Sequence, residues 1–205
     1  MRIAADLDGV ICDFIASMRT HGNKLWPGRF PEKWSPLDYD FTDIQTPTDT
    51  HELFQYMADT ATFWYDLPEL PGALTLHNWL HTPQSMGHDI YYITSRFPTT
   101  KGLNTLAQTS KWLRRRQLLD IGTSVCVVPH AADKPALMDA LNIDIMIDDK
   151  PETVELSCHD RPSYLLDCTW NRKPEHMHLK RVFSVEEFLR KVDTLNSSPE
   201  LRSFR

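Results

Sequence analysis

Short apolar runs alternate with longer amphipathic stretches along most of this chain. Five runs have the length of buried strands, and each ends in polar or turn residues, as parallel strands covered on both faces do. We therefore expect a parallel sheet from five strands. They lie at residues 3–6, 90–94, 125–128, 145–148 and 164–166.

Helical patterns fill the intervals between these strands. Residues 101–119 contain no internal proline, and Leu103, Leu106 and Leu113 are spaced to share one apolar face. This stretch is therefore expected to be a helix that packs on the sheet through its leucines.

Three further helices are expected nearer the carboxyl terminus. Asp133 can cap a helix that is entered through Pro135, and Pro151 can open the next one. Residues 185–192 have the pattern of a last amphipathic helix. Strands that alternate with helices predict an α/β fold, a three-layer Rossmann-like sandwich with a central parallel sheet.

Residues 16–71 break this alternation. The interval is rich in proline, threonine and aspartate, has no clear buried strand, and holds 10 of the 21 aromatic residues. We expect a small helical cap inserted after the first strand. The catalytic core would then comprise residues 1–15 and 72–195, and residues 196–205 would form a flexible polar tail.

Composition narrows the classes of partner. A chain of 205 residues is long enough for one domain with a smaller insertion. The net charge of −6, with no basic run beyond residues 114–116, argues against a nucleic-acid polymer. The sequence contains neither an apolar run of about 18 residues nor a signal-peptide pattern, so we expect a cytoplasmic protein with no membrane partner.

The cysteines and histidines do not form recognisable sites. The four cysteines have no C-x-x-C spacing and are expected to be reduced and mostly buried. His77 with His81, and His176 with His178, lack further ligands at suitable spacing, which argues against zinc.

Polar side chains that could carry chemistry follow the predicted strands. Asp6 and Asp8 end the first strand, Thr94 and Ser95 end the second, and Asp148 and Asp149 end the fourth. Lys134 lies at an expected helix start between them. Because ligands bind at the carboxyl edge of open α/β sheets, we expect a site there.

This order of motifs resembles the haloacid dehalogenase superfamily of phosphotransferases over nearly the whole chain. The resemblance implies that the first and fourth strands are neighbours and that Mg²⁺ is the cofactor. It also implies Asp6, Asp148 and the backbone carbonyl of Asp8 as metal ligands, with Asp149 acting through water or outer hydrogen bonds. Hard oxygen ligands of this kind suit Mg²⁺.

The same resemblance implies a mechanism. Asp6 would attack phosphorus to form an aspartyl-phosphate, and Asp8 would serve as general acid and then general base. Thr94, Ser95 and Lys134 would bind the phosphoryl oxygens. Arg96 either contacts substrate or is an exposed loop arginine.

Further segments resemble the 5′(3′)-deoxyribonucleotidases, the cytosolic type C family and its bacterial and phage relatives. They are residues 6–14, residues 63–73, and the Trp170-Asn171-Arg172 stretch before Arg181. The resemblance implies that Phe14 stacks on a nucleobase while cap aromatics, Phe63 or Trp64, close over it. The alternative is that these rings form only the core of the cap.

The sequence therefore predicts a phosphomonoesterase whose substrate is a nucleoside monophosphate. A phosphatase of another small metabolite and a phosphomutase stay open, as does a phosphate-binding protein without turnover. A halogen-removing enzyme is disfavoured because it needs neither Asp8 as an acid nor a metal. Base and sugar preference, the position of the phosphate, and the oligomeric state, for which a homodimer is one alternative, are left open.

Overall fold

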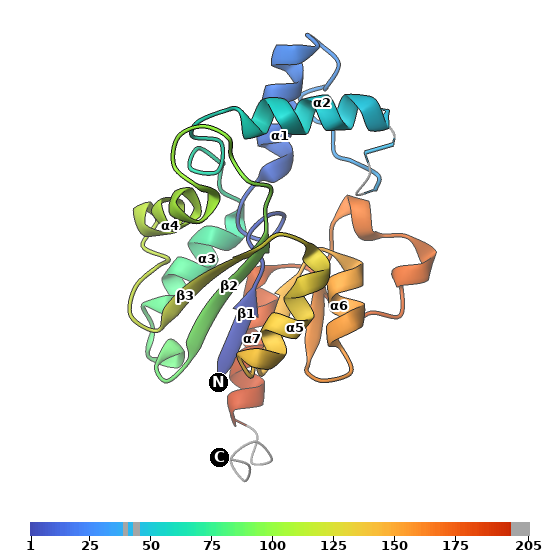
Figure 1. The fold of residues 1–205 in the computed structure, drawn as a ribbon. Helices are drawn as coiled ribbons and strands as arrows, with labels where there is room; N and C mark the ends of the chain where they lie inside the picture. The colour runs from blue at the N-terminus through green and yellow to red at the C-terminus, as the bar shows by residue number, and fades with distance from the viewer. Residues whose placement is uncertain (39–40, 43–45, 198–205) are drawn as a thin grey trace.

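The centre of the protein is a six-stranded parallel sheet. A computed structural model describes residues 1–38, 41–42 and 46–197, and its strand order is β3-β2-β1-β4-β5-β6 (Figure 1). All neighbouring strands pair in parallel. The strands are β1 (Arg2–Ala5), β2 (Asp89–Ser95), β3 (Thr123–Val128), β4 (Ile145–Asp148), β5 (Ser163–Leu166) and β6 (Arg181–Val182).

The structure confirms the five expected strands and the α/β class. It adds β6, which is too short to give a signal in the apolar pattern. The expected pairing of the first and fourth strands is also confirmed, because Ile3, Ala4 and Ala5 lie in register with residues 145–147.

Helices cover both faces of the sheet. Successive residues of β1 point to opposite faces: Ile3 and Ala5 join the core cluster under α3, α4 and α7, whereas Ala4 joins the cluster under α5 and α6. The helices are α1 (Phe14–Leu25), α2 (Pro47–Ala58), α3 (Pro71–Leu80), α4 (Thr105–Arg115), α5 (Lys134–Ala140), α6 (Pro151–Ser157) and α7 (Val185–Ser197).

The first two helices lie apart from this sandwich. Figure 1 shows α1 and α2 packed together beyond the end of the sheet at which β2 and β3 finish. Asp13 begins α1 by accepting a hydrogen bond from the Ala16 backbone N–H at 2.8 Å, and Thr46 and Asp49 form a capping box at the start of α2. The side chains of Asp13 and Thr46 therefore cap the first turns of α1 and α2.

Helix α4 differs from the sequence prediction. It spans residues 105–115 rather than 101–119, and Leu103 and Leu106 are exposed. Its buried face also carries polar side chains, because these residues bond to the loops that bound the functional site, as described below. The buried residues are Thr105, Gln108, Thr109, Trp112 and Leu113.

Other local expectations had mixed outcomes. Pro151 opens α6 as predicted, but the Asp133 side chain forms no capping hydrogen bond at α5.

Residues 196–197 belong to α7 rather than to a tail, and residues 198–205 lie outside the described residues. The four cysteines are unpaired, and Cys158 is exposed. None of the helices described is long and apolar enough to cross a bilayer.

Helix α3 packs closely against the loop that follows β1. A Cβ atom at Gly72 would lie 2.6 Å from the Val10 carbonyl oxygen and 2.5 Å from Val185 Cγ2. Glycine therefore permits an approach that holds the loop after β1 against α3 and α7.

We expect Gly72→Ala to destabilise the protein although alanine is the better helix former. The helix-propensity gain is about 1 kcal/mol, whereas overpacking against backbone and a branched side chain costs about 1–3 kcal/mol. Chemical denaturation measures the change in unfolding free energy. Leu74→Ala, on the exposed face of the same helix, is the matched control and should change it little; a Gly72→Ala variant more stable than wild type would contradict the prediction.

Candidate active site

The carboxyl ends of β1 and β4 bring two carboxylates together. Asp6 follows β1 directly and donates its backbone N–H to the Ile147 carbonyl at 3.0 Å, while Asp148 ends β4. The chain then turns through Gly9 at φ +80°, where a Cβ atom would lie 2.1 Å from Asp149 Oδ2. Glycine at this position therefore lets the loop approach Asp149.

Lys134 lies between the two strand ends. Its Nζ is 3.0 Å from Asp6 Oδ1 and 2.8 Å from Asp148 Oδ2, and its side chain is buried. Burial alone would lower the pKa of Lys134, but the charges of Asp148 and Asp6 outweigh burial and raise it. The lysine therefore carries a fixed positive charge at the start of α5.

Negative charge exceeds positive charge in this cluster. The pKa of Asp6 is raised to about 7, mainly by burial and also by the charges of Asp148 and Asp8, while the charge of Lys134 opposes the rise. The two rises have different main causes, which are burial for Asp6 and the neighbouring carboxylates for Lys134.

The donor set fits a divalent cation. Oxygen atoms of Asp6, Asp148 and Asp149 lie within 4.8 Å of one another, and all three residues are buried. Asp6 Oδ1 is buried without a hydrogen bond of good geometry, although Lys134 lies close to it. Mg²⁺ prefers oxygen ligands such as carboxylates, and its charge would compensate for the excess negative charge here.

Asp8 is held differently from Asp6. Arg96 Nε donates to Asp8 Oδ2 and Nη2 to Oδ1, both at 2.8 Å, and the Thr94 hydroxyl donates to Oδ2 at 3.2 Å. The Arg96 side chain is completely buried and that of Asp8 is 18% exposed. Burial would lower the pKa of Arg96, but Asp8 outweighs burial and raises it.

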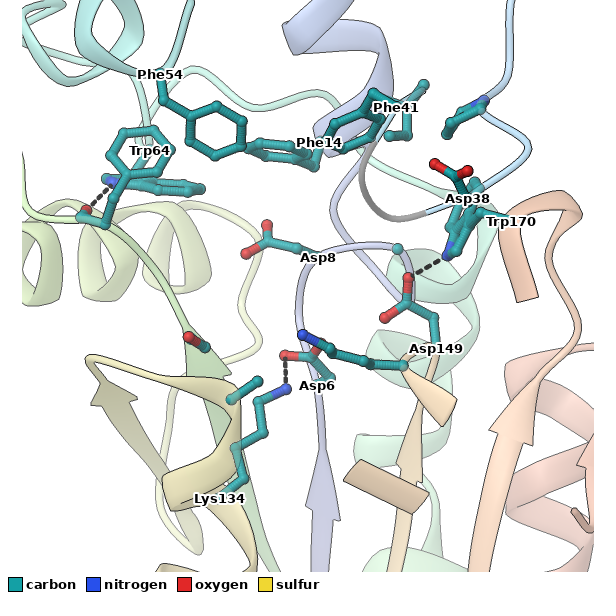
Figure 2. Close-up of a pocket in the computed structure, with 17 residues that line it drawn as sticks. Asp6, Asp8, Phe14, Asp38, Phe41, Phe54, Trp64, Lys134, Asp149 and Trp170 are labelled. Carbon is teal, nitrogen blue, oxygen red and sulfur yellow. Dashed lines mark hydrogen bonds and ion pairs between the residues drawn. The ribbon is translucent and has the colours of Figure 1, made fainter. Parts of the chain in front are cut away.

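An aromatic cavity of ≈ 260 Å³ opens above these groups. This volume is just below the range of about 300–1,000 Å³ that is usual for small-molecule sites. Figure 2 shows Asp6, Lys134 and Asp149 at one end and the rings of Phe14, Phe54 and Trp64 at the other, with Trp170 beside Asp149. The rings that line it are Phe14, Phe41, Phe54, Trp64, Phe97 and Trp170.

Seven of the eleven predicted site residues line the cavity, and four do not. Asp6, Asp8, Phe14, Trp64, Ser95, Lys134 and Asp149 line it; Asp148, Thr94, Arg96 and Phe63 do not.

Direct contact of Arg96, Phe63 or the Thr94 side chain with a cavity ligand is thus not supported by the geometry. Arg96 is paired with Asp8, and the alternative of an exposed loop arginine is wrong because only 3% of its surface is exposed. Phe63 packs edge-on against Trp64 at 4.8 Å between ring centroids, and the Thr94 hydroxyl bonds to Asp8.

Several lining residues were not predicted. Trp170 donates its indole N–H to Asp149 Oδ2 at 2.9 Å, and the adjacent Asn171 amide donates to the Asp149 carbonyl at 2.8 Å. The Trp-Asn pair was visible in the sequence as a motif without a role. Asp38, Phe41 and Phe54 lie in the aromatic-rich interval, which gave no signal for individual residues.

Comparison with known proteins agrees with this geometry. The sequence profile of the family described as 5′ nucleotidase, deoxy (pyrimidine), cytosolic type C protein matches residues 1–192. A protein of Oceanobacillus iheyensis that carries a provisional nucleotidase name is 24% identical over 200 residues, which are 92% of this chain and 97% of the relative.

Solved structures share the fold. A haloacid dehalogenase-like hydrolase of Streptococcus pneumoniae superimposes with a TM-score of 0.61 at 15% identity, covering 93% of this chain and 97% of that chain. The L-2-haloacid dehalogenase of Xanthobacter autotrophicus gives 0.56 at 12% identity, covering 94% and 98%. The fold is thus that of haloacid dehalogenase-like hydrolases, and by its sequence the chain belongs to the cytosolic type C 5′-nucleotidase family.

Proposed function

We propose that the protein is a Mg²⁺-dependent phosphomonoesterase that hydrolyses nucleoside monophosphates through an aspartyl-phosphate. The observation that carries the proposal is the arrangement of Asp6. Its carboxylate lies at the end of an aromatic cavity beside Lys134, within a cluster of buried carboxylates. In line with the family description, we also place the enzyme in the cytosol.

Asp6, Asp148 and the backbone carbonyl of Asp8 would hold the metal, with Asp149 supporting it. When bound, Mg²⁺ would neutralise the phosphate and allow an anionic nucleophile to approach it. Asp149 is itself fixed by Trp170 and Asn171, so its carboxylate is oriented before a metal arrives.

The chain's own residues would carry the chemical steps. Asp6 attacks phosphorus while Asp8 protonates the departing alkoxide, and Asp8 then takes a proton from the water that hydrolyses the aspartyl-phosphate. Lys134 stabilises charge on the phosphoryl oxygens. Ser95 lines the cavity and can donate to the same oxygens, whereas Thr94 acts on Asp8.

The aromatic side chains that line the cavity support a flat base, rather than a second sugar, as the group bound there. We propose that residues 16–71 form the cap, which brings Phe54 and Trp64 around Phe14. Phe14 is stacked near Trp64, with 5.9 Å between centroids and 21° between planes. A nucleobase laid against Phe14 would keep its phosphate at the opposite, charged end of the cavity.

The nucleophile can be tested by Asp6→Asn. The variant should fold, because it removes one of several buried charges that repel one another, but phosphate release should fall by a factor on the order of 10⁴ or more. The assay is phosphate release from a nucleoside monophosphate with Mg²⁺, alongside a circular dichroism spectrum. Wild-type turnover by the folded variant would refute the assignment.

The metal can be tested through protein stability as well as through activity. Because Mg²⁺ would bind only the folded carboxylate cluster, a concentration of about 100 times Kd should add about 2.7 kcal/mol to the free energy of unfolding. Asp148→Ala should abolish both this stabilisation and the activity. Asp160→Ala, at an exposed acid outside the cluster, is the control. Undiminished wild-type activity in excess chelator would contradict the metal assignment.

The substrate class can be tested by Phe14→Ala. Base stacking is worth about 1–3 kcal/mol, so kcat/KM for nucleoside monophosphates should fall about 5–150-fold. A small aryl phosphate should be spared because it lacks a base. Phe183→Ala, at an exposed ring outside the cavity, is the control. If the ratio of kcat/KM for the nucleotide to kcat/KM for the aryl phosphate is unchanged in Phe14→Ala, Phe14 does not recognise the base, although the protein can still be a phosphatase.

A further inference from the structure

Hydrogen bonds hold the Asp8 carboxylate in one orientation. Two nitrogens of Arg96 bond to its two oxygens, each at 2.8 Å, and Thr94 bonds to Oδ2. A guanidinium that binds both oxygens fixes the plane of the carboxylate as well as its position. A single point charge would fix only the position.

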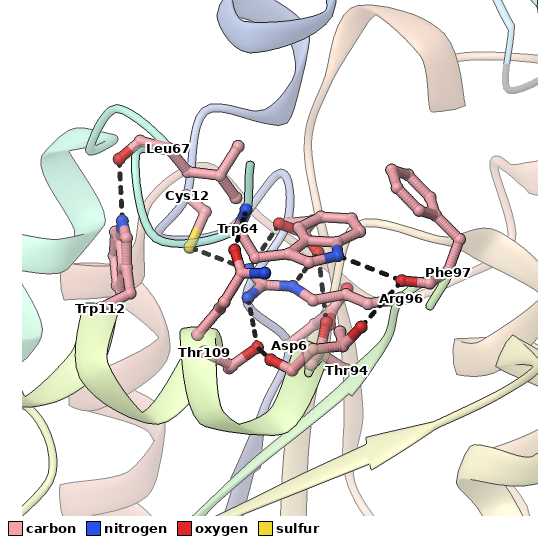
Figure 3. Close-up of polar contacts among 12 residues, drawn as sticks. Asp6, Cys12, Trp64, Leu67, Thr94, Arg96, Phe97, Thr109 and Trp112 are labelled. Atoms are coloured by element: carbon pink, nitrogen blue, oxygen red, sulfur yellow. Dashed lines mark hydrogen bonds and ion pairs between the residues drawn. The ribbon is translucent and has the colours of Figure 1, made fainter. Parts of the chain in front are cut away.

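Arg96 is itself fixed by contacts on its other sides (Figure 3). Its Nη1 donates to the Thr109 hydroxyl at 2.9 Å, and its Nη2 approaches Cys12 Sγ at 3.3 Å. The Trp64 ring lies over the guanidinium, with its centroid 4.6 Å from Cζ. Neither Arg96 nor its partner Thr109 lines the cavity.

Stability alone does not account for this arrangement. A buried ion pair contributes little net stability, and apolar side chains of similar volume often serve the fold as well or better. Retention of a charged group here is better explained by what it does to Asp8, which lines the cavity.

The two oxygens of Asp8 are not equivalent. A carboxylate oxygen accepts about two hydrogen bonds. Among the described residues, Oδ2 accepts from both Arg96 and Thr94, whereas Oδ1 accepts only from Arg96. Oδ1 therefore keeps a lone pair for a proton.

Resting on the proposed phosphatase function, we propose that Arg96 is a positioning residue that presents Asp8 Oδ1 to the leaving oxygen. In the first step an Asp6 oxygen bonds to phosphorus, the bond from phosphorus to the leaving oxygen breaks, and the Oδ1 proton moves to that oxygen. In the second step water gives a proton to Oδ1, its oxygen bonds to phosphorus, and the Asp6–phosphorus bond breaks. Arg96 itself touches neither substrate nor phosphorus.

Arg96→Lys tests orientation separately from charge. Lysine keeps a positive charge but cannot bind both oxygens of Asp8. The readout is kcat/KM for the phosphomonoester that the wild-type enzyme cleaves fastest, and for its analogue with sulfur in the bridging position. A thiol has a pKa of about 8.5 and leaves as the thiolate without a proton, so only the oxygen ester depends on Asp8 as an acid.

We expect a selective loss. Asp8→Asn should lower kcat/KM for the oxygen ester about 100-fold more than for the sulfur ester, the usual size of a general-acid contribution. Arg96→Lys should lower kcat/KM for the oxygen ester about tenfold more than for the sulfur ester. This effect is smaller than the loss of up to about 100-fold that a misplacement of 1 Å causes. Because the two substrates share all other groups, binding changes cancel in the ratio.

Arg116→Lys is the matched control. Arg116 also stacks on an indole, that of Trp112 at 3.9 Å, and also pairs with an acid, Glu69 at 2.7 Å, but it lies outside the cavity. The oxygen-to-sulfur ratio of this variant should equal that of wild type.

A second variant covers the case in which Arg96→Lys does not fold. Thr109→Val removes the hydroxyl that holds Arg96 Nη1 and should give a smaller loss of the same selectivity. Equal losses on both substrates, or none, in the folded Arg96 variant (or in Thr109→Val if that variant does not fold) would overturn the role of Arg96. A wild-type protein that cleaves no phosphomonoester, or an active Asp6→Asn variant, would instead overturn the proposed function and the inference with it.

Discussion

Excess negative charge at the carboxyl edge of β1 and β4 is the constraint on which the site depends. Parallel pairing of these strands forces Asp6 and Asp148 together, Asp149 follows Asp148 directly, and the turn through Gly9 leaves room for the Asp149 carboxylate. Buried like charges repel strongly, because the protein interior screens them less than water does. A nearby cation relieves this repulsion, and one protein cation, Lys134, lies between Asp6 and Asp148.

The second buried cation, Arg96, acts on Asp8, the proposed acid and base. Arg96 pairs with Asp8 rather than with the cluster around Asp6, so the two aspartates of the Asp-x-Asp motif have different partners. This separation explains the polar inner face of α4. Thr109 binds the Arg96 guanidinium, and Gln108 accepts from the Trp64 backbone N–H at 3.1 Å. The helix therefore supports the site as well as the core.

Site residues that directly follow a strand could be predicted from the sequence. Asp6, Asp148 and Asp149 could be placed at one edge of the sheet because short apolar runs identify buried strands and parallel strands end at one edge. That the first and fourth strands are neighbours was implied by the family resemblance. The inward face of α4 was predicted wrongly because leucine spacing suggested an apolar contact, whereas Thr109 and Gln108 face polar groups of loops. The burial of Arg96 was also out of reach, since its partner Asp8 is 88 residues away in sequence.

Trp64 connects these two parts of the site. Its backbone N–H bonds to Gln108 and its indole N–H to the Phe97 carbonyl at 3.1 Å, so the ring is fixed in position. It lines the cavity and also covers the buried guanidinium of Arg96. Covering the guanidinium excludes water, which strengthens the bonds from Arg96 to Asp8. The aromatic wall is therefore also part of the environment that orients Asp8, and a change of its shape would reach both substrate binding and proton transfer.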